Sequence, residues 1–429
     1  MASQEKHIVI VGGGIIGCTS AYYLTHHPSY DPSKHKVTLL EATKIAGGAS
    51  GKAGGLLALW AYPREIVPLS YRLHKELASK YDGEERWGYR AVHCGQVDCK
   101  GRNLPAKDTV KGKDREMDGE NETAVNGEKE RVSLQKRTKE AMGKLRAAGV
   151  PNDLDWVHPD VLRAYDEMGD PSTTAQVHPY QFTSSMADLA KEAGADVKVG
   201  ASVKSIQYND KGDQVTGVTY TENNEQKTIP ATDIIVSAGP WSSKVYPKAP
   251  ISALRAHSVT IRPTRPVSAY ALFTEIKLPA GFSRTDEMQK SKGRHEQVVT
   301  PEIYARPKNE VYACGEGDHI VPLPESSDLV EVDESRCQDI VDYVGSISDE
   351  LRDGEVTARQ ACYLPNVHAG RSNGPLVGPT HVKGLLIATG HTCWGIQNGP
   401  ATGKLMSEFV FDGKAKSASV KGLDPRLVL

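Results

Sequence analysis

The sequence has no excess of charge of either sign. Its 52 lysine and arginine residues nearly balance 54 aspartate and glutamate residues, which gives a formal net charge of −2 over 429 residues. Such a chain produces no strong positive field, so we expect binding neither to nucleic acid nor to an anionic membrane surface. The sequence also lacks an apolar run as long as a bilayer is thick, and we predict no transmembrane segment.

Cysteine is scarce, and its number is odd. Seven cysteines are scattered through the chain, a pattern that predicts reduced thiols rather than a disulfide framework. The polar N-terminal residues lead straight into an apolar segment, which leaves no room for a signal peptide. The C-terminal residues are not the Ser-Lys-Leu peroxisomal signal. We therefore expect a cytoplasmic protein, and we predict no metal site.

The strongest pattern in the sequence covers residues 7–41. An apolar run leads into a turn containing Gly12, Gly14 and Gly17, then a helix rich in small residues, then a second apolar run that ends in Glu41. This order of strand, glycine turn, helix, strand and acid is typical of a βαβ dinucleotide-binding unit. The helix N-terminus would face the phosphates. Glu41 would accept hydrogen bonds from a ribose, which argues against NADP but does not separate FAD from NAD.

A second glycine-rich loop, AGGASGKAGGLL, follows at residues 46–57. So many small residues indicate a backbone pressed against a large flat ligand, the alternative being a flexible surface loop. Lys52 is the only charged residue of this loop. It is either a cation beside the ligand or a solvated side chain.

The middle of the chain predicts an insertion and a separate sheet. Residues 100–131 are dense in charged residues, glycine and asparagine, and we expect a mobile insertion followed by a helix at 136–148. Another helix is predicted at 184–193. Residues 233–241 predict a buried strand that ends in a small-residue turn beside the nucleotide crevice. Proline-rich apolar runs from 250 to 330 predict an antiparallel sheet that forms a substrate lobe.

The C-terminal region repeats the strand–turn–helix pattern. An apolar strand at 384–389 runs into a glycine turn at 390–395, and an amphipathic helix continues to Phe411. A second helix N-terminus would thereby face the site, where its positive dipole end suits negative charge on a reduced flavin. A nicotinamide enzyme has no comparable need, and for this reason we favour FAD over NAD.

These segments together resemble the FAD-dependent amine oxidoreductases of the D-amino-acid oxidase type, the DAO family. The similarity is closest to an uncharacterised fungal branch of oxidoreductases. The resemblance rests on VGGGIIGCTSAYYL with Glu41, GGASGKAGGLL, VHPYQFT, DIIVSAGPW, PLVGP and IATGHTCWGIQNGPATGKLM, in that order along almost the whole chain.

The resemblance implies a fold of α/β type with added antiparallel β-structure. A discontinuous Rossmann-like FAD-binding domain would comprise residues 1–87, 166–249 and 356–429. An antiparallel substrate domain would be inserted as residues 88–165 and 250–355.

The resemblance also implies a set of cofactor-binding residues. The adenosine would lie on the first glycine turn, and the isoalloxazine would lie between the second loop and the C-terminal turn. His391 would contact the cofactor through its side chain or only through its backbone. The full set is Gly12, Gly14, Ile15, Ile16, Gly17, Glu41, Ala42, Ser50, Gly51, Lys52, Ala53, Gly54, Gly55, Leu56, Val203, Ala238, Gly239, Trp241, Gly390, His391, Trp394, Gly395, Ile396 and Gln397.

The chemistry that the resemblance implies is oxidation of a C–N bond of an amino acid or related small amine by hydride transfer to flavin N5. A carboxylate-bearing substrate would need a planar cation, with phenols to assist. Arg306 is the candidate for that cation and Tyr304 for its helper, the alternative being a surface arginine on a sheet edge. His257 is a third catalytic candidate, or else a structural histidine of the same lobe.

Departures from the family pattern leave three points open. No histidine lies between His35 and His74, where some relatives attach the flavin, so we predict a non-covalent FAD. Cys362 is the one suspected attachment point, and a buried structural thiol is the other interpretation of this residue. Gln397 stands where sarcosine-type oxidases have a lysine, which leaves a dehydrogenase open beside an oxidase.

A competing function belongs to another class. The FAD scaffold could serve as a binding or trafficking adaptor with little or no catalysis. In that case the charged segment 100–131 would be a docking segment for a protein partner.

Overall fold

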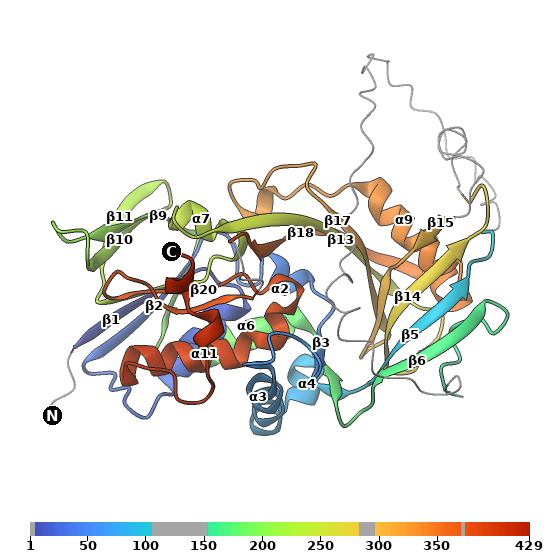
Figure 1. Cartoon of the computed structure of the whole chain (residues 1–429), viewed down its shortest axis with the longest axis horizontal. Helices are drawn as coiled ribbons and strands as arrows, with labels where there is room; N and C mark the ends of the chain where they lie inside the picture. The colour runs from blue at the N-terminus through green and yellow to red at the C-terminus, as the bar shows by residue number, and fades with distance from the viewer. Residues whose placement is uncertain (1–4, 105–150, 152, 283–296, 370–373) are drawn as a thin grey trace, which may run out of the picture.

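The computed structural model describes residues 5–104, 151, 153–282, 297–369 and 374–429. These residues form two lobes that lie side by side in Figure 1. The lobe on the left contains both chain termini, and the lobe on the right contains a large curved sheet. The predicted insertion beyond Leu104 and the predicted helix at 136–148 lie outside the described residues.

The first lobe is built on a six-stranded sheet in the order β19–β20–β12–β1–β2–β8. Neighbouring strands pair in parallel, except that β19 and β20 pair antiparallel. The central strands are nearly continuous apolar runs because both faces of the sheet are covered. The strands are β1 (Lys6–Val11), β2 (His35–Glu41), β8 (Asp196–Val199), β12 (Asp233–Val236), β19 (Leu376–Pro379) and β20 (Leu385–Thr389).

Helices cover one face of this sheet and a small sheet covers the other. Ile8 and Ile10 of β1 point into the helical core, whereas Val9 and Val11 point into the core beneath the three-stranded sheet β11–β10–β9. This separation follows from the alternation of side chains along a strand. The covering elements are α1 (Ile15–Thr25), α3 (Val67–Lys80), α6 (Pro179–Glu192), α11 (Gly395–Asp412), β9 (Ala201–Tyr208), β10 (Val215–Glu222) and β11 (Glu225–Pro230).

The second lobe is an eight-stranded sheet, and its outer face is covered by α9 (Glu334–Gly345) and α10 (Asp349–Arg352). The prediction of an antiparallel lobe is confirmed with one correction: β5 and β14 pair in parallel. That pair joins segments far apart in the chain, so no hairpin dictates its direction. The strands are β5 (His93–Lys100), β6 (Leu162–Gly169), β13 (Ile251–Arg262), β14 (Tyr270–Leu278), β15 (Gln297–Val299), β16 (Glu302–Arg306), β17 (Glu310–Asp318) and β18 (Glu355–Val367).

Short elements join the two lobes. A three-stranded sheet in the order β3–β7–β4 lies between them. The helix predicted from residue 184 begins earlier, at Pro179, because His178 caps it with a side-chain hydrogen bond to the Gln181 N–H. The remaining elements are α2 (Ala49–Lys52), β3 (Leu56–Ala58), α4 (Gly83–Trp87), β4 (Arg90–Ala91), β7 (Thr174–Gln176), α7 (Ser242–Val245) and 3₁₀ turns at Gly239–Trp241, Ser327–Leu329, Thr392–Trp394, Lys421–Leu423 and Pro425–Leu427.

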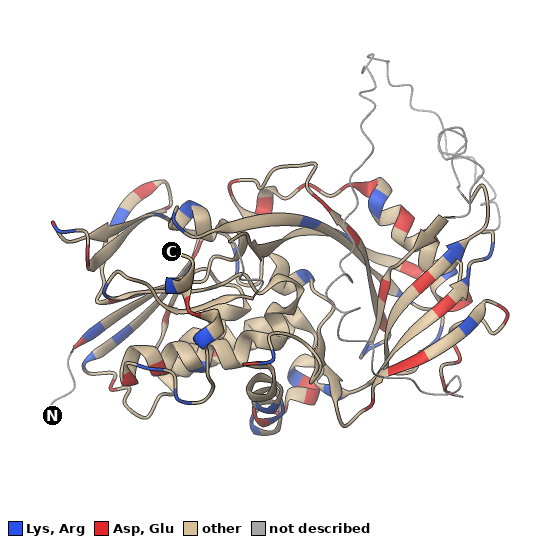
Figure 2. Cartoon of the chain, in the orientation of Figure 1, with Lys and Arg blue, Asp and Glu red and all other residues tan. Residues whose placement is uncertain are grey.

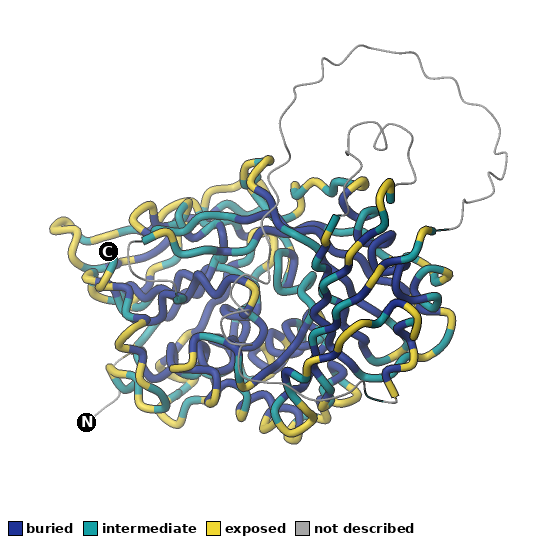
Figure 3. The backbone as a smooth tube through the Cα atoms, turned by 45° about the vertical axis from the view of Figure 1, so that its right-hand side comes forward, coloured by how far each residue is buried: buried dark blue, intermediate teal, exposed yellow. Residues whose placement is uncertain are grey.

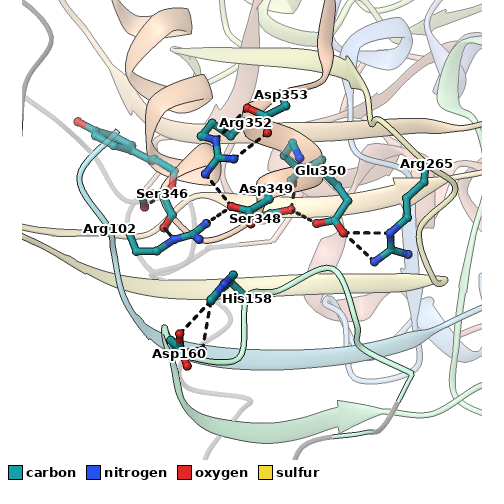
Figure 4. Close-up of polar contacts among 12 residues, drawn as sticks. Arg102, His158, Asp160, Arg265, Ser346, Ser348, Asp349, Glu350, Arg352 and Asp353 are labelled. Atoms are coloured by element: carbon teal, nitrogen blue, oxygen red, sulfur yellow. Dashed lines mark hydrogen bonds and ion pairs between the residues drawn. The ribbon is translucent and has the colours of Figure 1, made fainter. Parts of the chain in front are cut away.

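A polar network fastens the chain on both sides of the undescribed segment to α10. Arg102 donates to Asp349 at 2.5 Å, and Arg352 donates to the same oxygen at 2.7 Å (Figure 4). Arg265 bridges Glu350 to Asp155, with Nη1 at 3.1 Å from the Asp155 carboxylate. Because these groups are partly solvated, the network orients the chain more than it stabilises the fold.

The surface carries both signs of charge throughout. Figure 2 shows basic and acidic residues interspersed on both lobes, and Figure 3 shows the buried backbone running through the middle of each lobe. Within the part of the chain that the structure describes, no helix combines the length and apolar character needed to cross a bilayer.

Candidate cofactor and active site

A cavity of about 500 Å³ opens at the carboxyl ends of β1, β2, β12 and β20. We call it the main cavity. It lies where the nucleotide crevice of a parallel sheet is expected. The residues predicted for the cofactor that line it are Gly12, Gly14, Ile15, Ile16, Glu41, Ala42, Ser50, Ala53, Val203, Ala238, Gly239, Trp241, His391, Gly395 and Ile396.

The first glycine turn directs the start of α1 at this cavity. Gly12 has a φ of +108°, and a Cβ there would lie 2.7 Å from the Ser237 carbonyl oxygen, so only glycine fits without strain. Gly14 caps α1 in an extended conformation. The N-terminal turn of α1 therefore forms one wall of the cavity and offers its dipole to an anionic group.

Glu41 is held in place at the end of β2. Its Oε2 accepts from the Gly13 N–H at 2.7 Å, and its Oε1 accepts from the N–H and hydroxyl of Thr43 at 2.8 and 3.0 Å. A carboxylate has about four acceptor positions, so Glu41 keeps capacity for a ribose hydroxyl. The observed geometry fits the nucleotide end of a dinucleotide cofactor.

The second glycine loop includes the short helix α2 and lies directly beside the start of α1. Ser50 Oγ accepts from the Ile15 N–H at 2.9 Å, which joins the two loops. Lys52 Nζ donates to the Ala361 carbonyl at 2.8 Å, and burial lowers the pKa of Lys52. Lys52 is thus a fixed, partly desolvated cation and not a freely solvated side chain.

The C-terminal turn closes the cavity from the opposite end of the chain. His391 is buried, its Nε2 lies 3.0 Å from Thr402 Oγ1, and burial lowers its pKa to about 3. The imidazole is therefore neutral at physiological pH. Gln397 accepts from the Ala58 N–H at 2.7 Å, so α11 is tied to the strand that follows the second glycine loop.

Several predicted cofactor residues do not line the main cavity but support those that do. Gly17 packs against the Gly12 carbonyl, and Trp394 lies edge-on to Trp60 with ring centroids 5.6 Å apart. The others of this kind are Gly51, Lys52, Gly54, Gly55, Leu56, Gly390 and Gln397.

Two of the three catalytic candidates share one face of the eight-stranded sheet, and the third lies on the other face. Tyr304 belongs to the cluster that packs against Leu56 and Trp394. Arg306 lies on the same face, with its guanidinium bonded to the Ala53 and Gly54 carbonyls and to Glu310. His257 accepts from the Asp333 N–H at 3.1 Å, at the start of α9 on the outer face. This placement separates His257 from the main cavity.

Cys362 is buried and does not line the cavity, although Leu364 and Pro365 of the same strand do. Burial raises the pKa of Cys362 to about 11. Covalent attachment at this thiol therefore stays a prediction.

Sequence reasoning missed a segment that we call the clasp, residues 324–328. Trp241 Nε1 donates to the Pro324 carbonyl at 2.8 Å, Lys244 pairs with Glu325 at 2.9 Å, and Ser327 Oγ lies 2.7 Å from Thr43 Oγ1. The last four residues of the clasp line the nucleotide side of the cavity. Nothing local in the sequence indicated this, because every partner comes from a distant segment.

Comparison with known proteins agrees with this geometry. Residues 7–409 match the model of the family DAO, described as "FAD dependent oxidoreductase". The Saccharomyces cerevisiae protein named "Putative oxidoreductase TDA3" is 39% identical, with 99% of this chain and 95% of that protein covered. The Schizosaccharomyces pombe protein C1F5.03c, which has the same description, is 32% identical, with coverage of 99% and 98%.

Solved structures show the same fold. Glycine oxidase from Geobacillus kaustophilus superposes with a TM-score of 0.67 at 16% identity, over 98% of both chains. The predicted fold class, a Rossmann-like lobe joined to a largely antiparallel one, is confirmed.

Proposed function

The chain belongs to the DAO family of FAD-dependent oxidoreductases, and from this premise we propose that it oxidises a C–N bond of an amino acid or related small amine. FAD bound in the main cavity would supply the two-electron acceptor. The observation that carries the proposal is the meeting of two helix starts, α1 and α11, at one cavity. Each start comes from an opposite end of the chain.

The chain's own residues have distinct tasks under this proposal. The start of α1 and Glu41 would hold the pyrophosphate and ribose. The start of α11 would place its positive dipole end near the ring that gains negative charge. Lys52 is fixed by the Ala361 carbonyl outside the lining of the cavity, and from there it would add its positive charge to the field at the ring.

The substrate would approach from the eight-stranded sheet. The aromatic cluster of Trp60, Phe273, Tyr304 and Trp394 lies between that sheet and the glycine loops. Such packing excludes water and holds a small substrate in a fixed orientation. The domain limits predicted from sequence, at residues 165/166 and 355/356, stay a proposal. In the structure, β6 continues to Gly169 and β18 lies wholly in the sheet of the second lobe.

The experiment is an anaerobic substrate screen followed by the absorbance of bound flavin. The panel contains D-amino acids, N-methyl amino acids, glycated amines and simple primary amines. We expect at least one to bleach the oxidised flavin band. A panel that leaves the band unchanged throughout, in protein that retains FAD, would contradict the proposal.

A further inference from the structure

The face of the eight-stranded sheet that meets the glycine loops carries an acid. We call this the inner face. On β16, Tyr304 packs in the cluster that contains Leu56 and Trp394, whereas Ile303 and Ala305 belong to the core on the α9 side. Glu302 is two residues before Tyr304, so it points to the inner face as well. It pairs across the sheet with Phe273 and Cys314 of that same cluster.

Arg306, the cation on the same strand, already donates to other groups of the protein. Arg306 donates from Nη1 to Glu310 at 2.7 Å and from its other nitrogens to the Ala53 and Gly54 carbonyls. Its guanidinium lies 4.8 Å above the Tyr312 ring, and its side chain is only 4% exposed. Neither Arg306 nor Glu302 is in the lining of the main cavity, so the difference between them lies in their partners. Arg306 therefore positions the second glycine loop and has little left to offer an anionic ligand.

Glu302, in contrast to Arg306, lacks an oppositely charged partner among the described residues. Its carboxylate accepts from the Tyr304 hydroxyl and from the Cys314 thiol at 3.8 Å. Within the described ranges, no lysine, arginine or histidine forms an ion pair with it. The residue as a whole is half-buried, and its carboxyl group lies deep enough for burial to raise its pKa. An enclosed acid without a cationic partner is uncommon in a stable fold, because burial of an unpaired charge is costly.

The cross-strand neighbours of Glu302 reach the cofactor turn, because Phe273 and Cys314 pack in the same cluster as Trp394 of that turn. Burial, the Glu302 carboxyl and the Cys393 thiol all raise the pKa of the Cys314 thiol. Cys393 lies in the same turn as Trp394 and lines the main cavity. Burial also raises the pKa of Glu302 itself, as is usual for a carboxyl that takes a proton in catalysis.

We propose that Glu302, oriented by Tyr304, binds the cationic nitrogen of the substrate and accepts its proton. This inference rests on the proposed function and narrows it: the substrate is an ammonium-bearing amine without a carboxylate beside the reacting carbon. In the proton step an ammonium N–H bond breaks and an O–H bond forms on the Glu302 carboxylate. The nitrogen keeps the electron pair, so the bound amine becomes neutral and ready for oxidation.

The test measures ligand binding to the FAD-loaded protein through shifts of the flavin absorbance. The two probes are propylamine and propionate, which match in length and differ in charge. We expect propylamine to perturb the spectrum and propionate to have no effect. In Glu302→Gln the propylamine dissociation constant should rise at least about tenfold, the loss expected for a charge-assisted hydrogen bond.

The matched control is Glu355→Gln, which changes an acid on the same sheet whose side chain is 66% exposed and paired with Arg262. Its propylamine affinity should equal that of the unchanged protein. Stronger binding of propionate than of propylamine would overturn the proposal. So would no response to either probe, or a Glu302→Gln protein that binds propylamine normally.

A second variant serves if Glu302→Gln does not fold. Tyr304→Phe keeps the ring and removes the hydroxyl that lowers the pKa of Glu302. The pH midpoint of propylamine binding should therefore move upward, since the carboxylate must be charged to bind. The other titratable groups facing Glu302 are Cys314 and Cys94, and both stay protonated because burial raises the pKa of each thiol. An unmoved midpoint would contradict the role of Glu302.

Failure of the proposed function and failure of the Glu302 role give different results. A purified protein without flavin would refute the proposed function and leave no spectrum to titrate. A yellow protein that is reduced by amino acids and binds propionate would support the proposed function and refute the role of Glu302.

Discussion

The side-chain oxygen of Gln397 accepts a hydrogen bond from the backbone N–H of Ala58 at 2.7 Å. Gln397 lies in the first turn of α11, and Ala58 ends the strand that follows the second glycine loop. Both residues are fully buried. This contact ties the start of the C-terminal helix to the strand after the second glycine loop, so the two sides of the cavity are fixed relative to each other.

Replacement of Gln397 with leucine should weaken both the fold and the cofactor site. The Ala58 N–H would be left buried without a partner, at a cost of about 1–3 kcal/mol. Urea unfolding measures that loss, and FAD fluorescence on dilution measures cofactor release. The exposed Gln226→Leu is the control. Equal stability of the two variants would show that the contact does not matter.

Gly54→Ala should destabilise the protein because the new methyl group would overlap the ring of Tyr304. Overpacking of this kind costs about 1–3 kcal/mol. Gly48→Ala, in the same loop, is the control, since its Cβ would meet only Trp241 at 3.7 Å. Thermal unfolding of the two variants should differ by several degrees. Similar melting temperatures would mean that Tyr304 does not pack against Gly54 as observed.

Loss of the clasp should accelerate release of FAD. Trp241→Phe removes the donor to the Pro324 carbonyl, and Lys244→Ala removes the ion pair with Glu325. Trp241→Phe should raise the FAD dissociation rate about threefold to tenfold, the effect of one hydrogen bond. Lys244→Ala should raise it less, because Glu325 is 86% exposed and the ion pair is solvated. Lys248→Ala, an exposed lysine nearby, should have no effect. Unchanged rates in both clasp variants would limit residues 324–328 to a structural role.

Acid should destabilise the fold in part through His74. Its Nε2 lies 3.0 Å from the Ile396 carbonyl, and burial lowers its pKa to about 4. In the unfolded chain the imidazole titrates near 6.5, so the unfolded state binds more protons between pH 6.5 and pH 4, and stability falls as pH drops through that window. The expected contribution is about 2 kcal/mol at pH 5.

The pH effect can be isolated by unfolding at pH 7.5 and pH 5. His74→Gln should lose less stability on acidification than the unchanged protein does, whereas the exposed His381→Gln should behave like the unchanged protein. Equal pH dependence in all three proteins would refute the assignment.

Local patterns predicted the nucleotide lobe well. The strand, glycine turn, helix and acid of residues 7–41 are set by periodicity and by turn chemistry between near neighbours. The structure confirms β1, α1 and β2 and places Gly12, Gly14 and Glu41 at one cavity. The same holds for the second strand–turn–helix unit that ends in α11.

Tertiary contacts decided what the sequence alone could not show. The clasp depends on Trp241, Lys244 and Thr43, which no sequence spacing connects to residues 324–328. The proposed role of Glu302 depends on which face of the strand it occupies and on the absence of a cationic partner among the described residues. The sequence predicted that Arg306 could bind a substrate carboxylate. In the fold its guanidinium donates instead to Glu310 and to two backbone carbonyls.

The most direct measurement is the absorbance spectrum of the purified protein before and after acid precipitation. We predict a yellow protein whose FAD appears in the supernatant, as expected for a non-covalent cofactor in the cavity between α1 and α11. Flavin retained in the pellet would indicate covalent attachment, for which Cys362 is the candidate, and would still support FAD as the cofactor. A colourless protein that takes up no added FAD would contradict the binding of FAD in this cavity.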